Sequence, residues 1–111
     1  MDYTIVMYQY PLGTYLTHYT VNKLRNIKPH FLCFPEYFFV NKKLGNHVQT
    51  QHNQSLQLKR MQVLSKELNT VVIGGTMPEL NGNYLHNTTF VFHNGTMLGF
   101  YRKQNLFFAE E

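Results

Sequence analysis

Two short, continuously apolar runs constrain the fold of this chain more than any other feature. They lie at residues 30–34 (HFLCF) and 70–75 (TVVIGG), and neither alternates apolar with polar side chains. A strand of this kind has both faces buried, which is typical of a parallel sheet. Parallel strands also need a crossover connection, which is usually a helix. The two runs therefore predict interior strands of an α/β fold.

The segments around these runs supply the other elements that such a fold needs. Residues 3–9 are β-branched and aromatic and predict a first strand. We expect a helix from residue 14 to 27, whereas the polar residues 41–54 predict a loop. A second helix is expected over about residues 51–68 because apolar side chains recur on one of its faces, namely Leu58, Met61, Leu64 and Leu68.

The last third of the chain predicts a β-hairpin. Residues 84–92 and 96–102 form its strands, and the Asn-Gly pair at 94–95 is a strong turn signal. Gly74 and Gly75 predict close backbone packing and a tight exit from the second apolar strand. The order strand, helix, strand, helix, strand and hairpin implies a single sheet with right-handed crossovers.

Composition excludes several classes of protein. The chain carries a net charge of +4, but its basic residues are dispersed, which argues against a nucleic-acid partner. No apolar run approaches the ~20 residues of a membrane span, and the N-terminus lacks the basic start of a signal peptide. The single cysteine, Cys33, permits no internal disulfide and favours a reducing compartment, so a cytoplasmic location is expected.

The histidines do not predict a metal site. His47 and His52 are five residues apart in a polar segment, and His86 and His93 are seven apart in the hairpin. Neither spacing resembles a zinc site, so we expect no metal.

An isolated acid, Glu36, interrupts the apolar stretch LCFPEYFF at residues 32–39. An unpaired buried carboxylate is costly, so Glu36 needs a partner or an exposed position. Lys103 follows the strand predicted at 96–102, and reactive groups in open α/β sheets gather beyond strand ends. If both strands point the same way, Glu36 and Lys103 meet at one edge. The alternative to a functional role is a structural ion pair, or two unrelated exposed charges. Arg102 is expected to pair with an acid or a carbonyl, or to assist Lys103.

The order and spacing of these motifs resemble the carbon–nitrogen hydrolases of the nitrilase superfamily. Phe-Pro-Glu at 34–36 resembles the end of an apolar strand in that family. The Gly-Gly strand, the Asn-Thr pair at 87–88, the Asn-Gly turn and YRK-x-x-LF at 101–107 follow in the family's order. The resemblance covers nearly the whole chain and rests on the sequence of motifs rather than on any single one.

The resemblance implies specific roles. Glu36 corresponds to the general base, and Lys103 to the cation that stabilises the tetrahedral intermediate. Glu111, or its neighbour Glu110, corresponds to an acid that positions the substrate and the base. The family's nucleophilic cysteine follows the lysine by a few dozen residues and is not in this chain. Cys33 lies inside a predicted strand and is expected to pack as a small hydrophobic side chain.

The resemblance also implies an architecture and a substrate class. Residues 1–111 would form the N-terminal part of an αββα sandwich, a partial domain without the segment that carries the nucleophile. The parent reaction is hydrolysis of an amide, nitrile or carbamoyl compound, without a cofactor, in a homo-oligomer or with a complementing C-terminal chain. This chain would be inactive alone. The alternative is a non-catalytic binding or assembly module that uses the exposed half-sandwich face.

Overall fold

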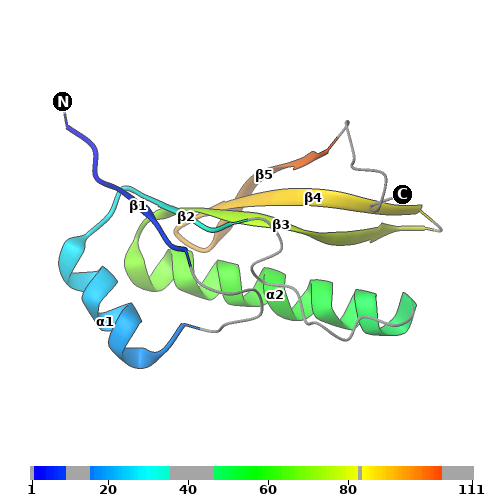
Figure 1. The fold of residues 1–111 in the computed structure, drawn as a ribbon, viewed down its shortest axis with the longest axis horizontal. Coiled ribbons are helices and arrows are strands. Elements are labelled where there is room, and N and C mark those ends of the chain that lie inside the picture. The colour runs from blue at the N-terminus through cyan, green and yellow to red at the C-terminus, as the bar shows by residue number, and fades with distance from the viewer. Residues whose placement is uncertain (1, 10–15, 36–46, 83, 104–111) are drawn as a thin grey trace.

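The computed structural model describes residues 2–9, 16–35, 47–82 and 84–103, and it has a mixed α/β fold (Figure 1). The strands form one five-stranded sheet in the order β1-β2-β3-β4-β5. Along the chain the elements are β1 (Ile5–Met7), α1 (His18–Ile27), β2 (Phe31–Cys33), α2 (His47–Leu68), β3 (Val71–Asn81), β4 (Tyr84–His93) and β5 (Thr96–Arg102). The predicted α/β class and the predicted order of elements are confirmed.

The helices lie on one face of the sheet. Strands β1, β2 and β3 are parallel and are connected through α1 and α2, whereas β3, β4 and β5 are antiparallel. Figure 1 shows both helices on the same side of the strands. Two right-handed crossovers that step in the same direction across a sheet give this arrangement.

The core lies between the helices and the sheet. Pairing aligns Leu32, Val72 and Phe92 across β2, β3 and β4, and their exposed fractions are 0%, 0% and 4%. These side chains pack with apolar residues of α2 in one cluster, as expected for a helix with an apolar face. The prediction of that face is confirmed by four residues: Met61, Leu64 and Leu68 are buried, and Leu58 packs against them.

The opposite face of the sheet is also apolar. The same register aligns two further rows of side chains, which alternate with the buried row. Ile5 and Met7 on β1 are 60% and 73% exposed. The rows are Ile5, Phe31 and Val71, and Met7, Cys33 and Ile73. Neither of the described helices covers this face, which we call the uncovered face, so within the described residues it presents hydrophobic surface.

Several element bounds differ from the prediction. Helix α2 begins at His47, so residues 47–50, predicted as loop, are helical. Helix α1 begins at His18 because the Thr17 hydroxyl caps it, accepting a hydrogen bond from the Thr20 N–H at 3.2 Å. Strand β1 is limited to Ile5–Met7. Propensity marks the existence of an element better than its ends.

The prediction that the second apolar strand ends at Gly74 and Gly75 is wrong. Strand β3 continues to Asn81, and its pairing with β4 shifts between Ile73 and Thr76, which marks a β-bulge. Gly75 has a φ of 66°, a left-handed conformation that glycine adopts at little cost. Glycines suit a bulge as well as an exit, and the long antiparallel partner β4 decides between them here.

The predicted close packing at the glycine pair is confirmed. A Cβ atom at Gly74 would overlap the Met61 side chain of α2. One at Gly75 would overlap the carbonyl oxygen of Pro35. The bulge of β3 therefore lies directly against the backbone that leaves β2.

The β4–β5 turn is fixed to helix α2. Asn94 and Gly95 both have positive φ, at 50° and 84°, as in a type I′ hairpin turn. The Gly95 N–H donates to Ser65 Oγ at 2.9 Å, and Gln62 Nε2 donates to the Gly95 carbonyl at 2.9 Å. The predicted Asn-Gly hairpin is confirmed, and these bonds hold its turn against the helix layer.

Replacing Gly75 should destabilise the fold through a steric clash. We expect Gly75→Ala to lower the free energy of unfolding by about 3 kcal/mol, because the new methyl group meets the Pro35 backbone in addition to the strain at positive φ. Gly82→Ala is the matched control, since Gly82 has a φ of 63° and no atom within 4 Å of the added Cβ. It should cost about 1 kcal/mol. Equal losses in urea unfolding would show that the approach of Pro35 is unimportant.

Candidate functional site

The strands that precede the two predicted catalytic positions point in the same direction. Strand β2 is parallel to β3, and β5 is parallel to β3 because two antiparallel steps through β4 separate them. The carboxyl ends of β2 and β5 therefore lie at the same end of the sheet. This meets the geometric condition under which Glu36 and Lys103 would share an edge.

The structure places only one of the four predicted site residues. Glu36, Glu110 and Glu111 lie outside the described residues. Pro35, which precedes Glu36, is described and packs against the β3 bulge at Gly75. The partnership between Glu36 and Lys103 stays a prediction, as does the role of either C-terminal acid.

Lys103 is partly buried and extends the hairpin ladder by one residue. Its N–H donates to the Asn87 carbonyl at 2.8 Å. Thr88 pairs with Arg102, so Asn87 and Lys103 continue the same register. Successive side chains of a strand point to opposite faces. Arg102 and Thr88 therefore share the helix-covered face, and Lys103 belongs to the opposite face.

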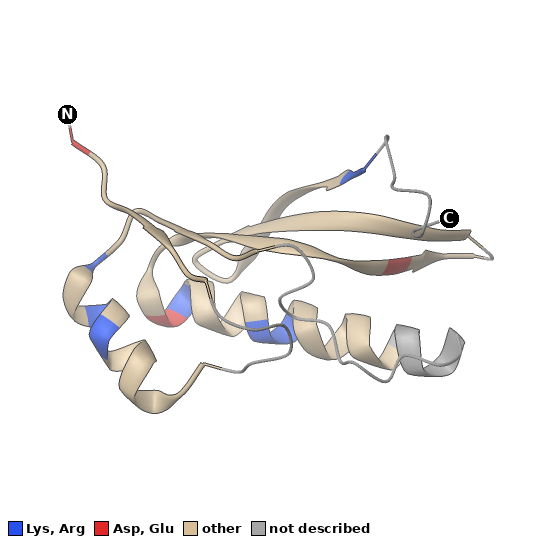
Figure 2. Ribbon diagram, viewed as in Figure 1, with Lys and Arg blue, Asp and Glu red and all other residues tan. Residues whose placement is uncertain are grey.

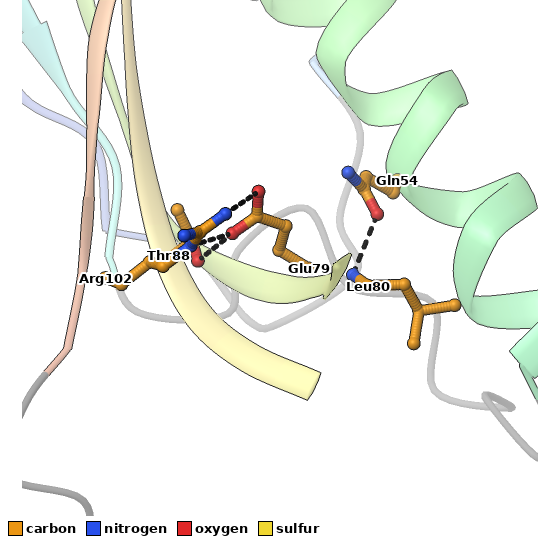
Figure 3. Close-up of polar contacts among 5 residues, drawn as sticks. All are labelled: Gln54, Glu79, Leu80, Thr88 and Arg102. Atoms are coloured by element: carbon orange, nitrogen blue, oxygen red, sulfur yellow. Dashed lines mark hydrogen bonds and ion pairs between the residues drawn. The ribbon is translucent and has the colours of Figure 1, made fainter. Parts of the chain in front are cut away.

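Glu79 is a residue that the sequence analysis missed. It lies in β3, is 8% exposed, and accepts three hydrogen bonds (Figure 3). Arg102 donates to it twice, from Nε at 2.8 Å and from Nη2 at 3.2 Å. Thr88 Oγ1 donates the third bond at 2.8 Å. Arg102 was expected to pair with an acid or a carbonyl, and Glu79 is that acid.

Glu79 was missed because the second apolar strand was predicted to end at Gly74 and Gly75. Once β3 runs through to Asn81, Glu79 falls on the same side of the strand as the buried Met77. An inward-facing carboxylate needs a cation, and the paired bases at the end of the hairpin supply one. Figure 2 shows the acid on β3 and the cations at the end of β5.

The charge state of Glu79 follows from these contacts. The hydrogen-bonded guanidinium of Arg102 holds the pKa of the Glu79 carboxyl below its ordinary value of 4.5, against the opposing effect of burial. Glu79 is therefore an ionised partner of Arg102, with its oxygens already occupied. It is not suited to act as a general base, and it lies on the opposite face from Lys103.

Cys33 lies on the uncovered face of the sheet and is partly exposed. Its register neighbours are Met7 on β1 and Ile73 on β3. An activated cysteine lies beside cations or a helix N-terminus, whereas these neighbours are apolar. Their chemistry supports the interpretation of Cys33 as a packing residue.

The described histidine side chains form no cluster of the kind that binds a metal ion. His30 Nδ1 accepts a hydrogen bond from the Thr4 N–H at 2.9 Å and thereby joins the start of β1 to β2. Within residues 2–9, 16–35, 47–82 and 84–103, no three His, Cys, Asp or Glu side chains lie close enough to share a metal ion.

A groove of about 470 Å³ lies away from the strand ends, between the two helices. Its lining consists of Leu16, Val21, Lys59, Arg60, Val63, Leu64 and Glu67. Because it lies between the helices rather than beyond the strand ends, we do not assign it to the candidate site.

Comparisons with known proteins concern both sequence and fold. The sequence model of the family described as "Carbon-nitrogen hydrolase" matches residues 19–111. No curated protein sequence matches the chain significantly. None of the described helices is both long and apolar enough to cross a membrane.

Solved structures share the fold. A crystal structure of an N-terminal amidase has a TM-score of 0.70 at 16% identity, covering 97% of this chain and 29% of that chain. A carbon-nitrogen hydrolase from Helicobacter pylori G27 has a TM-score of 0.60 at 19% identity, covering 78% and 33%. Saccharomyces cerevisiae Nit3, of branch 10 of the nitrilase superfamily, has a TM-score of 0.57 at 16% identity, covering 77% and 36%. The chain thus spans about a third of the length of these proteins.

The ion pair of Glu79 should contribute stability that depends on pH. We expect Glu79→Gln to lower the free energy of unfolding by about 1–3 kcal/mol at pH 7, because Arg102 loses a charged acceptor. The folded-state pKa of Glu79 is lowered, so its contribution is present above pH 4.5 and is lost as the pH falls further. In urea unfolding, the difference between the two proteins should therefore shrink as the pH is lowered below 4.5.

Glu67→Gln is the matched control for this measurement. Glu67 pairs with Arg25 at 3.6 Å, but both side chains are about half exposed, at 49% and 51%. Exposed pairs contribute at most about 1 kcal/mol. If Glu67→Gln cost as much as Glu79→Gln at pH 7, the burial of Glu79 would not be the source of its effect.

Proposed function

The chain belongs to the carbon-nitrogen hydrolase family, and we propose that it is the N-terminal part of an enzyme that hydrolyses a non-peptide carbon–nitrogen bond. The supporting observation is the position of Lys103. It follows β5 at the end of the sheet where β2 also ends, on the face opposite the Glu79–Arg102 pair. The substrate class is a small amide, nitrile or carbamoyl compound.

The proposed chemistry divides the catalytic work among three side chains. Glu36 accepts the thiol proton as a cysteine sulfur attacks the carbon and forms a carbon–sulfur bond. The oxygen or nitrogen of the substrate then takes up negative charge, which the ammonium of Lys103 stabilises. Collapse breaks the carbon–nitrogen bond of an amide or carbamoyl compound, the leaving nitrogen takes the proton held by Glu36, and ammonia or an amine departs. A nitrile forms a thioimidate instead, which releases its nitrogen as ammonia after water adds to the carbon and protonates the nitrogen. Water then hydrolyses the acyl-enzyme and regenerates the thiol.

The proposal sets a geometric requirement for the segment after Pro35. Strands β2 and β5 are separated by three strand spacings, roughly 14 Å. Glu36 must therefore approach Lys103 across β3 and β4. The Pro35 backbone already packs on the β3 bulge, which is the first step of that path.

The nucleophile must come from outside these 111 residues. Cys33 is the only cysteine in the chain, and its apolar neighbours do not favour activation. We therefore propose that residues 1–111 are a partial domain, inactive alone, whose second part carries the cysteine. That part would come from the same polypeptide or from a separate chain.

A second candidate function is a non-catalytic assembly module. The observation that favours it is the apolar sheet face, where Ile5 and Met7 are 60% and 73% exposed. The coding sequence downstream of residue 111 distinguishes the two functions. An in-frame or frameshifted continuation with a cysteine at a strand end supports the hydrolase, and its absence beside a stable soluble product supports the module.

Activity measurements test the hydrolase directly. We expect no turnover of amides, nitriles or carbamoyl compounds by the purified chain. We expect turnover once a polypeptide that supplies the cysteine is added. In that assembly Lys103→Met should lower kcat at least about 100-fold, since it removes the charge that stabilises the intermediate. Glu36→Gln should be similarly impaired.

Two variants serve as controls in the same assay. Lys59→Met removes an exposed lysine from α2, and Cys33→Ala removes the thiol of β2; both should leave turnover unchanged. Hydrolysis by the chain alone that disappears in Cys33→Ala would overturn the proposed division of roles.

The uncovered face predicts self-association of the isolated chain. We expect concentration-dependent oligomers in sedimentation velocity, weakened by Ile5→Lys or Met7→Lys because a charge interrupts the apolar surface. Ile27→Lys is the control, since Ile27 is 45% exposed on α1 in the helix layer. A monomer at all concentrations, with a sharp cooperative melt, would contradict this expectation.

A further inference from the structure

Two adjacent cations, Arg102 and Lys103, stand at the end of β5 and lie on opposite faces of the sheet. The register of β5 determines which of them lies on which face. We propose that Glu79 sets this register: by binding Arg102 it stabilises the pairing of β5 with β4 that places Lys103 on the uncovered face. Glu79 is thus a positioning residue for Lys103. The importance of Lys103 rests on the proposed function, whereas the selection of register does not.

Two registers are available because β5 contains one residue more than the strand segment of β4 with which it pairs. Next to the turn, His93 pairs with Thr96 and Phe92 with Met97. Beyond that point Val91 pairs with Gly99, so Leu98 has no counterpart and forms a bulge. A one-residue offset in pairing exchanges the two faces of a strand. The bulge therefore inverts every side chain of β5 that follows it.

The pairs next to the turn also define the alternative register, in which β5 has no bulge. If the turn register continued, Thr88 would pair with Tyr101, and Asn87 would pair with Arg102. Arg102 would then share the uncovered face with Asn87, and Lys103 would lie on the helix-covered face. The turn bonds from Ser65 and Gln62 are compatible with either arrangement, because the bulge lies beyond them.

The contacts of Arg102 favour the bulged register. Its guanidinium forms a two-bonded fork with the Glu79 carboxylate, which a lysine ammonium cannot reproduce. Its cation–π contact with the Phe100 ring, 5.1 Å from the ring centre, does not distinguish the registers, because residues two apart share a face of β5 in both. Thr88, opposite Arg102 in the ladder, is 0% exposed and donates to the same carboxylate.

The unbulged register would lose the two hydrogen bonds of Arg102 to Glu79 and add a cost. Glu79 would stay buried beside Thr88, and Tyr101 would enter the place of Arg102. Lys103 would then lie opposite His86, the pairing partner of Glu79, but a lysine ammonium cannot offer the carboxylate a two-bonded fork. A buried carboxylate that is incompletely satisfied is destabilising. The carboxylate is therefore the element that makes the bulge the stable solution.

Cross-strand NMR contacts in the full 111-residue chain measure the register. The wild type should show close α-protons of Thr88 and Arg102, which are a non-hydrogen-bonded pair. In Glu79→Gln this contact should weaken, and exchange of the Lys103 amide should rise roughly tenfold or more relative to that of Val72. Glu67→Gln, which breaks the exposed pair with Arg25, should change neither.

A composition-preserving variant keeps the test decisive if Glu79→Gln fails to fold. The double substitution R102K/K103R retains both positive charges but moves the guanidinium from position 102 to position 103. It should lose the wild-type contact between positions 88 and 102 and gain one between 88 and 101. General destabilisation would instead raise amide exchange throughout the sheet without a new contact.

The outcomes separate this inference from the proposed function. Wild-type contacts and Lys103 amide protection in both variants would overturn the role of Glu79, whatever the turnover. A register that depends on Glu79 in a protein without hydrolytic activity, even when complemented, would count against the hydrolase and leave the positioning role intact.

Discussion

The buried carboxylate of Glu79 is the charge around which the hairpin end of the sheet is organised. A carboxylate that is 8% exposed has to be matched, and the match comes from β5, two strands away from β3. The fork of Arg102 and the hydroxyl of Thr88 tie β3, β4 and β5 together at one level. Because Lys103 is the next residue, the pair that satisfies a buried charge also determines where a second cation lies.

Apolar pattern and turn chemistry predicted the fold, and they did so for physical reasons. The runs at 30–34 and 70–75 are the interior strands, and the Asn-Gly pair forms the turn. Strand β3 continues past two glycines because β4 pairs with it, so a tertiary contact overrides the local preference there. Helix α2 begins at His47, before the apolar periodicity from which its start was predicted.

The candidate site was only partly predictable from the sequence. Motif order indicated Lys103, and the directions of β2 and β5 agree with it. Glu79 was missed because the strand was expected to end at Gly75, so its inward orientation could not be deduced. The bulge at Leu98 gives no local signal, since it reflects a competition between two registers rather than a propensity.

The bulge in β5 also bears on how hairpins of this kind can change length during evolution. Removing the one extra residue, Leu98, would let β5 pair with β4 without a bulge, and Arg102 would still lie opposite Thr88. Removing two residues would, without a new bulge, place Arg102 opposite Thr89 and exchange the faces of the residues that follow. A single-residue gap in this segment is therefore compatible with an unchanged site, whereas a two-residue gap is a change of the site. The length of the segment carries information alongside the identity of its residues.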